Sequence, residues 1–280
     1  MPRLSRKRSI LYISIIYLAF IALLAVVEIG ARLTLPHVSS LDLFVGTSQQ
    51  KAQVADAQQS GIFEGDPLLL WRLRPNLNEV IWDFTVVSTN AQNLRANHMI
   101  KAKAPGAVRI ICLGDSVTFG YRVPPVWPEL PSDYDPNWLP YPMLLEKNLR
   151  AANPAREVEV IAMAVPGYTS HQGLAWLRRD INTLQPDLLI ASFGWNDVSF
   201  SEVPDREAIR TSPDAVALRW LINYSQAFAH ATKWLRTGNP RQIPALSKQH
   251  KLVPRVSEQE YLGNLNEISR LRANKELGWL

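Results

Sequence analysis

The chain has 280 residues, of which 47% are hydrophobic and 20% charged, a composition typical of globular proteins and unlike that of disordered or collagenous chains. Its formal net charge is +5, but residues 1–35 hold five basic side chains and one acidic one, so 25 basic and 24 acidic residues remain in the rest of the chain. Because the body of the chain is nearly neutral, the composition argues against nucleic-acid binding.

An uncharged apolar run of 18 residues, 10–27, follows the basic N-terminus. As a helix it would be about 27 Å long, close to the roughly 30 Å hydrocarbon core of a bilayer. A secretory signal peptide usually has a shorter apolar stretch, of about 7–15 residues, and ends in small residues that are missing here. We therefore predict an uncleaved single-pass anchor over residues 10–29. The basic side chains of residues 1–9 favour a cytoplasmic N-terminus and an extracytoplasmic location for the rest of the chain.

Two segments with different patterns lie between this anchor and the main domain. Residues 36–65 are polar and low in aromatic content, which predicts a stalk over residues 30–65, and residues 66–280 are expected to form the folded domain. Short alternating stretches between about residues 66 and 95 predict a small β-ribbon ahead of the main sheet.

Three apolar runs, 108–113, 158–165 and 188–193, have the length and composition of fully buried parallel strands. A helix is predicted between the first two runs, over residues 142–152. Another, capped by Ser170, is predicted between the second and third. The alternation of strands and helices predicts an α/β fold, a three-layer α/β/α sandwich around a parallel sheet.

Two further helices are predicted after the third strand. One spans residues 213–236 and is closed by Gly238; we expect it to pack on the core or cap the domain, with a lid or membrane-surface helix as the alternative. The last opens with a capping box of Ser257 and Glu260 and stops at Gly278. In a parallel sheet such a helix leads to a further strand, and none follows, so we expect the fold to be incomplete at the C-terminus.

Each predicted strand ends in a polar turn that contains glycine. The residues are Gly114, Asp115 and Ser116 after the first strand, Gly167 after the second, and Gly194, Asn196 and Asp197 after the third. Because the carboxyl ends of parallel strands meet at one edge of a sheet, these turns should lie together where α/β folds bind ligands. A serine on such a strand-to-helix turn is exposed, near N–H groups that favour a developing oxyanion. Taken singly, each turn also fits an ordinary loop or helix cap.

In this order and context, the three turns resemble those of the SGNH (GDSL-type) serine ester hydrolases, over roughly residues 66–278. The resemblance implies a flavodoxin-like sandwich in which Ser116 attacks an ester carbonyl. It also implies an oxyanion hole formed by the Ser116 N–H, the Gly167 N–H and the Asn196 side-chain amide. Gly114, Asp115, Gly194 and Asp197 would support the loops, without a cofactor or metal. The implied substrate is an O-acylated small molecule or glycan; the sequence names no protein partner.

The chain departs from this family at the catalytic base. The family carries an Asp-x-x-His block near its C-terminus, and the 280 residues contain no such pattern. The five histidines are His37, His98, His171, His230 and His250. Only His171 is near a catalytic turn, and a surface position is the favoured interpretation for it. A serine without a base is a poor nucleophile, so we predict that this chain is a truncated form and nearly inactive alone.

Three functional hypotheses remain open. The first is hydrolysis of an O-acyl group, for example on a cell-surface glycan; the second is acyl transfer to a polysaccharide by the same serine chemistry. The third is a non-catalytic anchored binding module. A nucleotide-binding protein is disfavoured because neither a P-loop nor a Gly-x-Gly-x-x-Gly pattern occurs.

Cys112 and a proline-rich loop are two further features of the sequence. Cys112, the only cysteine, excludes an internal disulfide, and its apolar setting predicts a buried small hydrophobe. The proline-rich loop of residues 122–142 is expected to tuck its aromatic side chains onto the domain surface, with a sugar- or acyl-binding wall as the alternative. Those aromatic residues are Trp127, Tyr134, Trp138 and Tyr141.

Overall fold

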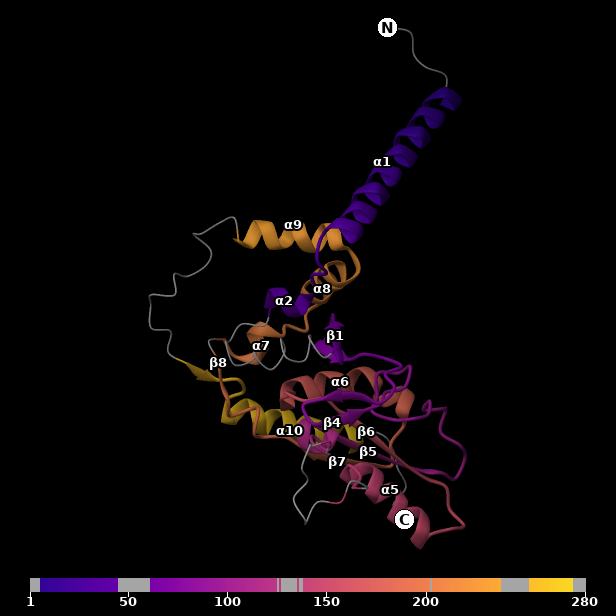
Figure 1. The fold of residues 1–280 in the computed structure, drawn as a ribbon, viewed down its shortest axis with the longest axis vertical. Coiled ribbons are helices and arrows are strands. Elements are labelled where there is room, and N and C mark those ends of the chain that lie inside the picture. The colour runs from indigo at the N-terminus through magenta and orange to yellow at the C-terminus, as the bar shows by residue number, and fades with distance from the viewer. Residues whose placement is uncertain are drawn as a thin grey trace.

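The structure is a computed structural model that describes residues 6–44, 61–124, 126, 135, 138–201, 203–237 and 252–273. A long helix, α1 (Arg6–Thr34), projects from the rest of the molecule (Figure 1). Its segment Ile10–Thr34 has the length and composition of a membrane span, with none of its most apolar window buried inside the protein. A signal sequence meets the same criteria.

The centre of the domain is a parallel three-stranded sheet in the order β6-β5-β7. Gly114, the last residue of β5, lies opposite Ala164 of β6 and Ser192 of β7. The carboxyl ends of the strands therefore meet at one edge, as the sequence predicts. The strands are β5 (Val108–Gly114), β6 (Val158–Ala164) and β7 (Leu188–Ser192).

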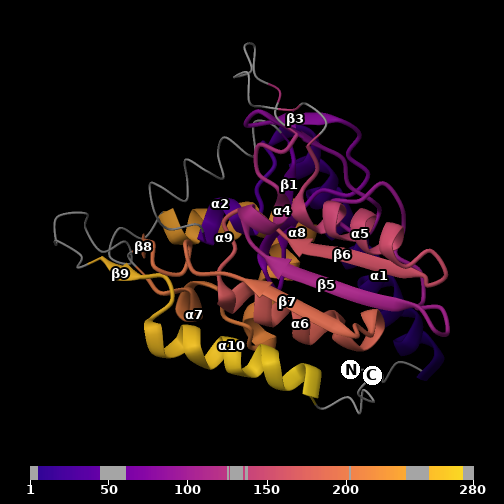
Figure 2. The same ribbon diagram turned by 90° about the horizontal axis from the view of Figure 1, so that it is seen from below.

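Helices cover both faces of the sheet, which confirms the predicted α/β architecture. The chain leaves β5 for β6 on one side through α5 (Tyr141–Ala152) and returns past β5 to β7 through α6 (Ser170–Leu184). Because such crossovers are right-handed, the reversal of direction puts α5 and α6 on opposite faces. α10 (Glu258–Ala273) packs beside α6 and contacts β7 (Figure 2). The adjacent ends of β5 and β7 thus form the switch point at which open α/β sheets bind ligands.

Strand β7 corrects one prediction, because it is not fully buried. Leu188, its first residue, is 37% exposed, whereas Ile111 and Leu113 of β5 are completely buried. The physical reason is position: β5 lies between two strands, and within the described residues no strand pairs with the outer edge of β7. Cys112 is buried in β5 as predicted, and burial raises the pKa of its thiol to about 11.

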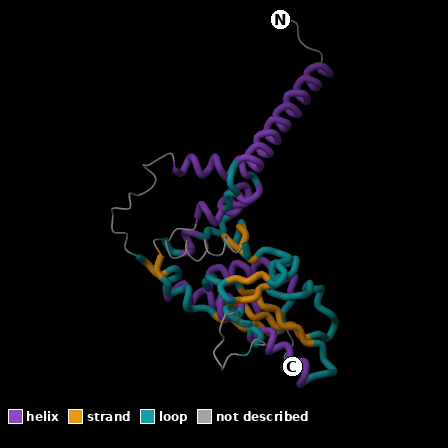
Figure 3. The backbone as a smooth tube through the Cα atoms, viewed as in Figure 1, coloured by secondary structure: helices purple, strands orange, loops and turns teal. Residues whose placement is uncertain are grey.

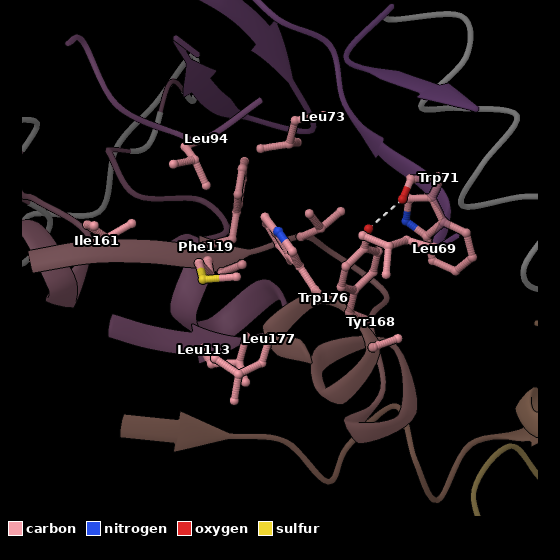
Figure 4. Close-up of a cluster of buried hydrophobic side chains, with 14 of the residues drawn as sticks. Leu69, Trp71, Leu73, Leu94, Leu113, Phe119, Ile161, Tyr168, Trp176 and Leu177 are labelled. Atoms are coloured by element: carbon pink, nitrogen blue, oxygen red, sulfur yellow. Dashed lines mark hydrogen bonds between the residues drawn. The ribbon is translucent and has the colours of Figure 1, made fainter. Parts of the chain in front are cut away.

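Two antiparallel hairpins form the predicted ribbon, and they are part of the main core. Trp71 and Leu73 of the first hairpin pack with Phe119, Tyr168 and other residues of the sheet domain in one hydrophobic cluster (Figure 4). The Tyr168 hydroxyl donates to the carbonyl of Trp71, and their rings meet edge to face at 5.5 Å. The hairpin strands are β1 (Phe63–Asp66) with β2 (Leu70–Leu73), and β3 (Val80–Trp82) with β4 (Thr85–Val87).

A layer of helices lies between α1 and the sheet (Figures 1 and 3). The predicted single helix over 213–236 is in fact two, α8 (Pro213–Tyr224) and α9 (Gln226–Thr237). The break has a clear cause, since Ser225 has extended backbone angles and a carboxylate from α1 accepts the first N–H groups of α9. Within the segment expected to be a stalk, α2 (Ser40–Phe44) packs against β1, β2 and α8.

The remaining short elements lie around the end of the sheet. They are α4 (Ser116–Phe119), β8 (Phe200–Ser201), α7 (Asp205–Ala208) and β9 (Val253–Pro254). β8 and β9 pair antiparallel. The predicted ends at Gly238 and Gly278 lie outside the described residues.

Candidate active site

The turn from β5 into α4 presents Ser116 at the edge of the sheet. A side chain at Gly114 would meet Thr118 and would lie 2.8 Å from the Ser192 carbonyl, so only glycine fits. Asp115 is the N-cap of α4, and its carboxylate accepts the Val117 N–H at 2.9 Å. Ser116 itself is half-buried, and among the described residues neither its N–H nor its hydroxyl has a hydrogen-bond partner. Both groups are therefore available to a ligand.

The loops after β6 and β7 meet this turn. The Nδ2 of Asn196 donates to the Tyr168 carbonyl at 2.9 Å and to the Asp115 carboxylate at 3.3 Å. Gly167, the residue before Tyr168, has a φ of +83°, a conformation that favours glycine, and within the described residues its N–H has no acceptor. The structure thus brings together the turns that hold Ser116, Gly167 and Asn196. The longer Asn196–Asp115 contact is the one that a bound oxyanion would displace more easily.

The helix that follows Ser116 is only one turn long. A helix this short has little macrodipole, because that dipole is the sum of many aligned peptide units. An anion at this edge would therefore meet individual N–H groups and the Asn196 amide, with little contribution from a helix dipole.

The two predicted supporting aspartates are buried hydrogen-bond acceptors. Asp197 is 1% exposed, and it accepts the backbone N–H of Ser170 at 2.9 Å and the Ser170 hydroxyl. Burial raises its pKa above the usual range, since water no longer solvates the carboxylate. Burial also raises the pKa of Asp115, with a smaller contribution from the negative charge of Asp197. These contacts agree with an orienting role for both side chains.

Gly194 begins the third turn, with a φ of +142°. Just before it, the Phe193 carbonyl accepts the hydroxyl of Tyr261 on α10 at 3.0 Å. Asn264 on the same helix donates to the Ser170 hydroxyl at 2.9 Å. α10 therefore holds both the third turn and the start of α6.

A buried ion pair behind the second turn was not predicted from the sequence. The guanidinium of Arg255 donates to the Asp205 carboxylate at 2.9 and 3.0 Å, and these side chains are 4% and 2% exposed. Arg255 also donates to the Gly167 carbonyl at 2.8 Å, while Asp205 accepts the Thr169 hydroxyl at 2.7 Å. This pair therefore holds the Gly167 turn through two hydrogen bonds, one to Gly167 and one to Thr169. No local sequence pattern marks either residue: Asp205 begins the four-residue helix α7, and Arg255 follows the two-residue strand β9.

The start of α6 differs by one residue from the prediction. Its N-cap is Thr169, and Ser170 is the first helical residue. The Gln172 side chain reaches back to the Thr169 N–H at 3.3 Å. A Thr-x-x-Gln capping signature in the sequence could have located this boundary.

The described histidines do not complete a triad. His171 bonds to the Ile209 carbonyl at 3.1 Å, and His230 bonds to the Pro36 carbonyl at 2.9 Å. His37 and His98 are exposed, and His250 lies outside the described residues. Among the described residues none of these rings is hydrogen-bonded to Ser116, and His171 is half-buried, with its ring bonded to the carbonyl of the buried Ile209.

The predicted aromatic loop is described only in part. Trp138 is 41% exposed, and the Tyr141 hydroxyl is 3.2 Å from the hydroxyl of Thr118, behind the nucleophile turn. Trp127 and Tyr134 lie outside the described residues. In the described part of the chain no group of histidine, cysteine and carboxylate side chains is arranged to hold a metal ion.

Comparison with known proteins gives the family. Residues 112–277 match the model of the GDSL-like lipase/acylhydrolase family, a span that contains all three turns. The chain belongs to this family. Its members are serine esterases and acylhydrolases, in agreement with the predicted chemistry. No curated protein sequence matches the chain.

Three solved structures illustrate the likeness. LAE5, an α/β hydrolase from the metagenome of Lake Arreo, is 20% identical, with a TM-score of 0.32 over 60% of this chain and 57% of its own. TesA is 16% identical, with a TM-score of 0.26 over 59% of this chain and 74% of its own. The lipase/acylhydrolase from Enterococcus faecalis is 19% identical, with a TM-score of 0.24 over 62% of this chain and all (100%) of its own. The chain thus spans little more than half the length of LAE5.

Proposed function

We propose that this GDSL-family protein is a membrane-anchored serine hydrolase that cleaves O-acyl esters outside the cytoplasm. The observation that carries the proposal is the link from Asp115 through Asn196 to Tyr168, which places two neighbouring loops beside Ser116. Next to it, the N–H groups of Ser116 and Gly167 have no acceptor among the described residues. Three neutral donors beside a serine hydroxyl suit acyl transfer.

The proposed chemistry follows from these groups. The Ser116 oxygen bonds to the ester carbonyl carbon while its proton leaves to a base, and the carbonyl oxygen becomes an oxyanion. The Ser116 N–H, the Gly167 N–H and the Asn196 amide stabilise that charge. The C–O bond to the alcohol then breaks, the alcohol takes a proton, and an acyl-Ser116 ester remains. Water attacks this ester, which releases the acid and restores the hydroxyl.

The base in this scheme is what the 280 residues lack, since they contain no Asp-x-x-His pattern. We therefore expect very slow turnover by this chain alone, because removing a catalytic base costs on the order of 10⁶ in rate in a well-studied hydrolase. An external base should restore part of the acylation step.

The proposal includes a location and a substrate class. Residues 10–29 anchor the chain with residues 1–9 in the cytoplasm, residues 30–65 connect the anchor to the domain, and residues 66–280 hold the site. The substrate is an O-acylated small molecule or a cell-surface glycan. Transfer of the acyl group to a polysaccharide hydroxyl is the alternative outcome of the same acyl-enzyme, and ligand binding without turnover is the other.

The test uses the full chain in detergent with an aryl acetate, with and without added imidazole as the external base. We expect imidazole to increase acetylation of Ser116, read by peptide mass spectrometry, and Ser116→Ala to remove the signal. Ser212→Ala, at an exposed serine that precedes α8 and lies in none of the three turns, is the matched control.

Each outcome has a clear meaning. Acetylation that is unchanged in Ser116→Ala would refute the nucleophile assignment. An acetyl-Ser116 that is captured by an added polysaccharide would support the transferase alternative. Ester binding without any acetyl-Ser116 would support the binding module.

A further inference from the structure

Helix α8 carries an exposed apolar stripe. Ala217, Trp220, Leu221 and Tyr224 have the i, i+3, i+4, i+7 spacing of one helix face, and all four are exposed. Trp220 is 51% and Tyr224 54% exposed, and their rings lie 5.0 Å apart. The apolar spacing that normally faces a core therefore faces outward here. We call these four residues the α8 stripe.

The opposite side of α8 is already packed against the domain. Ile222 is completely buried, and the buried Arg219 guanidinium donates to the Pro67 carbonyl at 2.6 Å. The helix is thus held in place by one face while the α8 stripe is left outside. An outward apolar stripe on a fixed helix indicates a contact with something apolar.

The α8 stripe ends where α1 begins to contact the domain. Arg32 of α1 donates to the carbonyl of Tyr224, the last stripe residue, at 2.6 Å. One turn earlier on α1, the Glu28 carboxylate accepts the Ser225 hydroxyl at 2.8 Å and the N–H groups of Gln226 and Ala227 at 3.0 and 3.1 Å. The end of α1 is therefore hydrogen-bonded to the junction of α8 and α9 (Figure 1).

Helix α9 starts at the same junction and is fixed to the segment that follows α1. The Gln226 side chain bonds to both the N–H and the carbonyl of Val38, at 2.8 and 3.0 Å. Towards its other end α9 exposes Leu235 (62%), with the exposed basic residues Lys233 and Arg236 beside it. α9 thus presents apolar and cationic side chains together at its end away from the α8–α9 junction.

We propose that the α8 stripe and Leu235 of α9 lie in the headgroup layer of the same bilayer that α1 spans. The inference rests on the proposed membrane anchor. The uncharged run of α1 ends at Val27, one residue before the Glu28 contact, so the α8–α9 junction is located at the level where α1 leaves the hydrocarbon. Tryptophan and tyrosine favour that level, and lysine and arginine favour its anionic headgroups. Because the α8 stripe adjoins the end of α1, we infer that lipid, and not another protein, covers it.

The test is a depth measurement on the full chain in nanodiscs with anionic lipid. A nitroxide is attached to a single introduced cysteine, and the native Cys112 does not compete because it is completely buried. The variants are Leu221→Cys and Leu235→Cys, with Leu262→Cys, an exposed leucine of α10, as the matched control and Ile16→Cys in α1 as the anchor reference. Collision with oxygen and with an aqueous nickel chelate distinguishes lipid, water and protein interior.

We expect the labels at 221 and 235 to give an oxygen-to-nickel collision ratio several-fold above that at 262 and below that at 16. A ratio at 221 and 235 equal to that at 262, with a lipid value at 16, would overturn the inference and leave the anchor standing. Low collision with both reagents at 221 would mean that protein, such as a second copy, covers the stripe, and would also overturn it. An aqueous value at 16 would refute the anchor and with it this inference. None of these readings depends on Ser116 chemistry.

Discussion

The C-terminal segment of residues 252–273 makes ion pairs at both of its ends, in two different environments. Near its start, Arg255 and Asp205 are 4% and 2% exposed and contact the Gly167 turn. Near its end, Glu267 pairs with Arg178 of α6, and these side chains are 42% and 47% exposed. Charge pairs in water contribute little to stability, whereas a buried pair cannot lose one partner without leaving an uncompensated charge. The same segment therefore holds the Gly167 turn through a buried ion pair and the middle of α6 through an exposed one.

The largest effect on stability is expected when the buried Asp205 carboxylate is removed. In Asp205→Ala the Arg255 guanidinium stays buried without its counter-ion, and the Thr169 hydroxyl loses its acceptor. We expect the free energy of unfolding to fall by about 3–5 kcal/mol. Glu267→Gln at the exposed pair should change it by only about 0–1 kcal/mol. Urea denaturation of the two variants measures the difference, and equal losses would show that burial does not separate the two pairs.

A substitution at Asn196 tests whether the edge that carries Ser116 stabilises an oxyanion. Asn196→Ala removes the proposed side-chain donor, and loss of one such donor costs about 10²–10³ in turnover. The measurement is the Ser116-dependent acetylation rate with imidazole present. Asn264→Ala, which removes a donor to Ser170 from α10, is the control and should retain most of that rate. An unchanged rate in Asn196→Ala would contradict its place in the oxyanion hole.

A smaller effect is expected at Gly167. An alanine there must adopt a φ near +83°, which costs about 1–2 kcal/mol for a residue with a Cβ. Its Cβ would also lie 3.3 Å from Cζ2 of Trp71, a tight contact. Gly167→Ala should therefore lower the free energy of unfolding by roughly that amount. Gly106 has a φ of +80° with open space around it, so Gly106→Ala measures the cost of the backbone conformation alone. The difference between the two variants then gives the cost of the contact with Trp71.

The smallest expected effect is the change in the free energy of unfolding with pH that Asp197 causes. Burial raises the pKa of Asp197 above its ordinary value of 3.8, so the folded state binds this proton more tightly than the unfolded state. The free energy of unfolding then falls as the pH rises from that value through the folded pKa. Asp197→Asn keeps the Oδ1 acceptor for Ser170 and changes only Oδ2, which has no partner among the described residues. Its stability relative to the parent chain should increase over that pH range. A constant difference would contradict the raised pKa.

The meeting of the three turns at one sheet edge was predictable from the sequence because its signals are local. The short apolar runs of the three strands, the glycine at 114 and the Ser257–Glu260 capping box each lie within a few neighbouring residues, and the structure has all of them. The Arg255–Asp205 pair was missed because its partners are 50 residues apart and neither has a distinctive setting. The break between α8 and α9 was missed for the same reason, since Glu28 contacts Gln226 across 198 residues.

The contact between Glu28, Arg32 and the α8–α9 junction has a consequence for how this protein meets its substrate. A domain on a flexible tether explores a hemisphere whose radius is the length of the tether. Here the end of α1 is hydrogen-bonded to Tyr224 and Ser225, so under the proposed anchoring the domain would be held at one height and tilt above the bilayer. With α1 in the bilayer, Ser116 would stay at a constant distance from the membrane surface as the protein diffuses laterally. Acyl groups at that height would be met repeatedly, and identical groups held farther out would be out of reach.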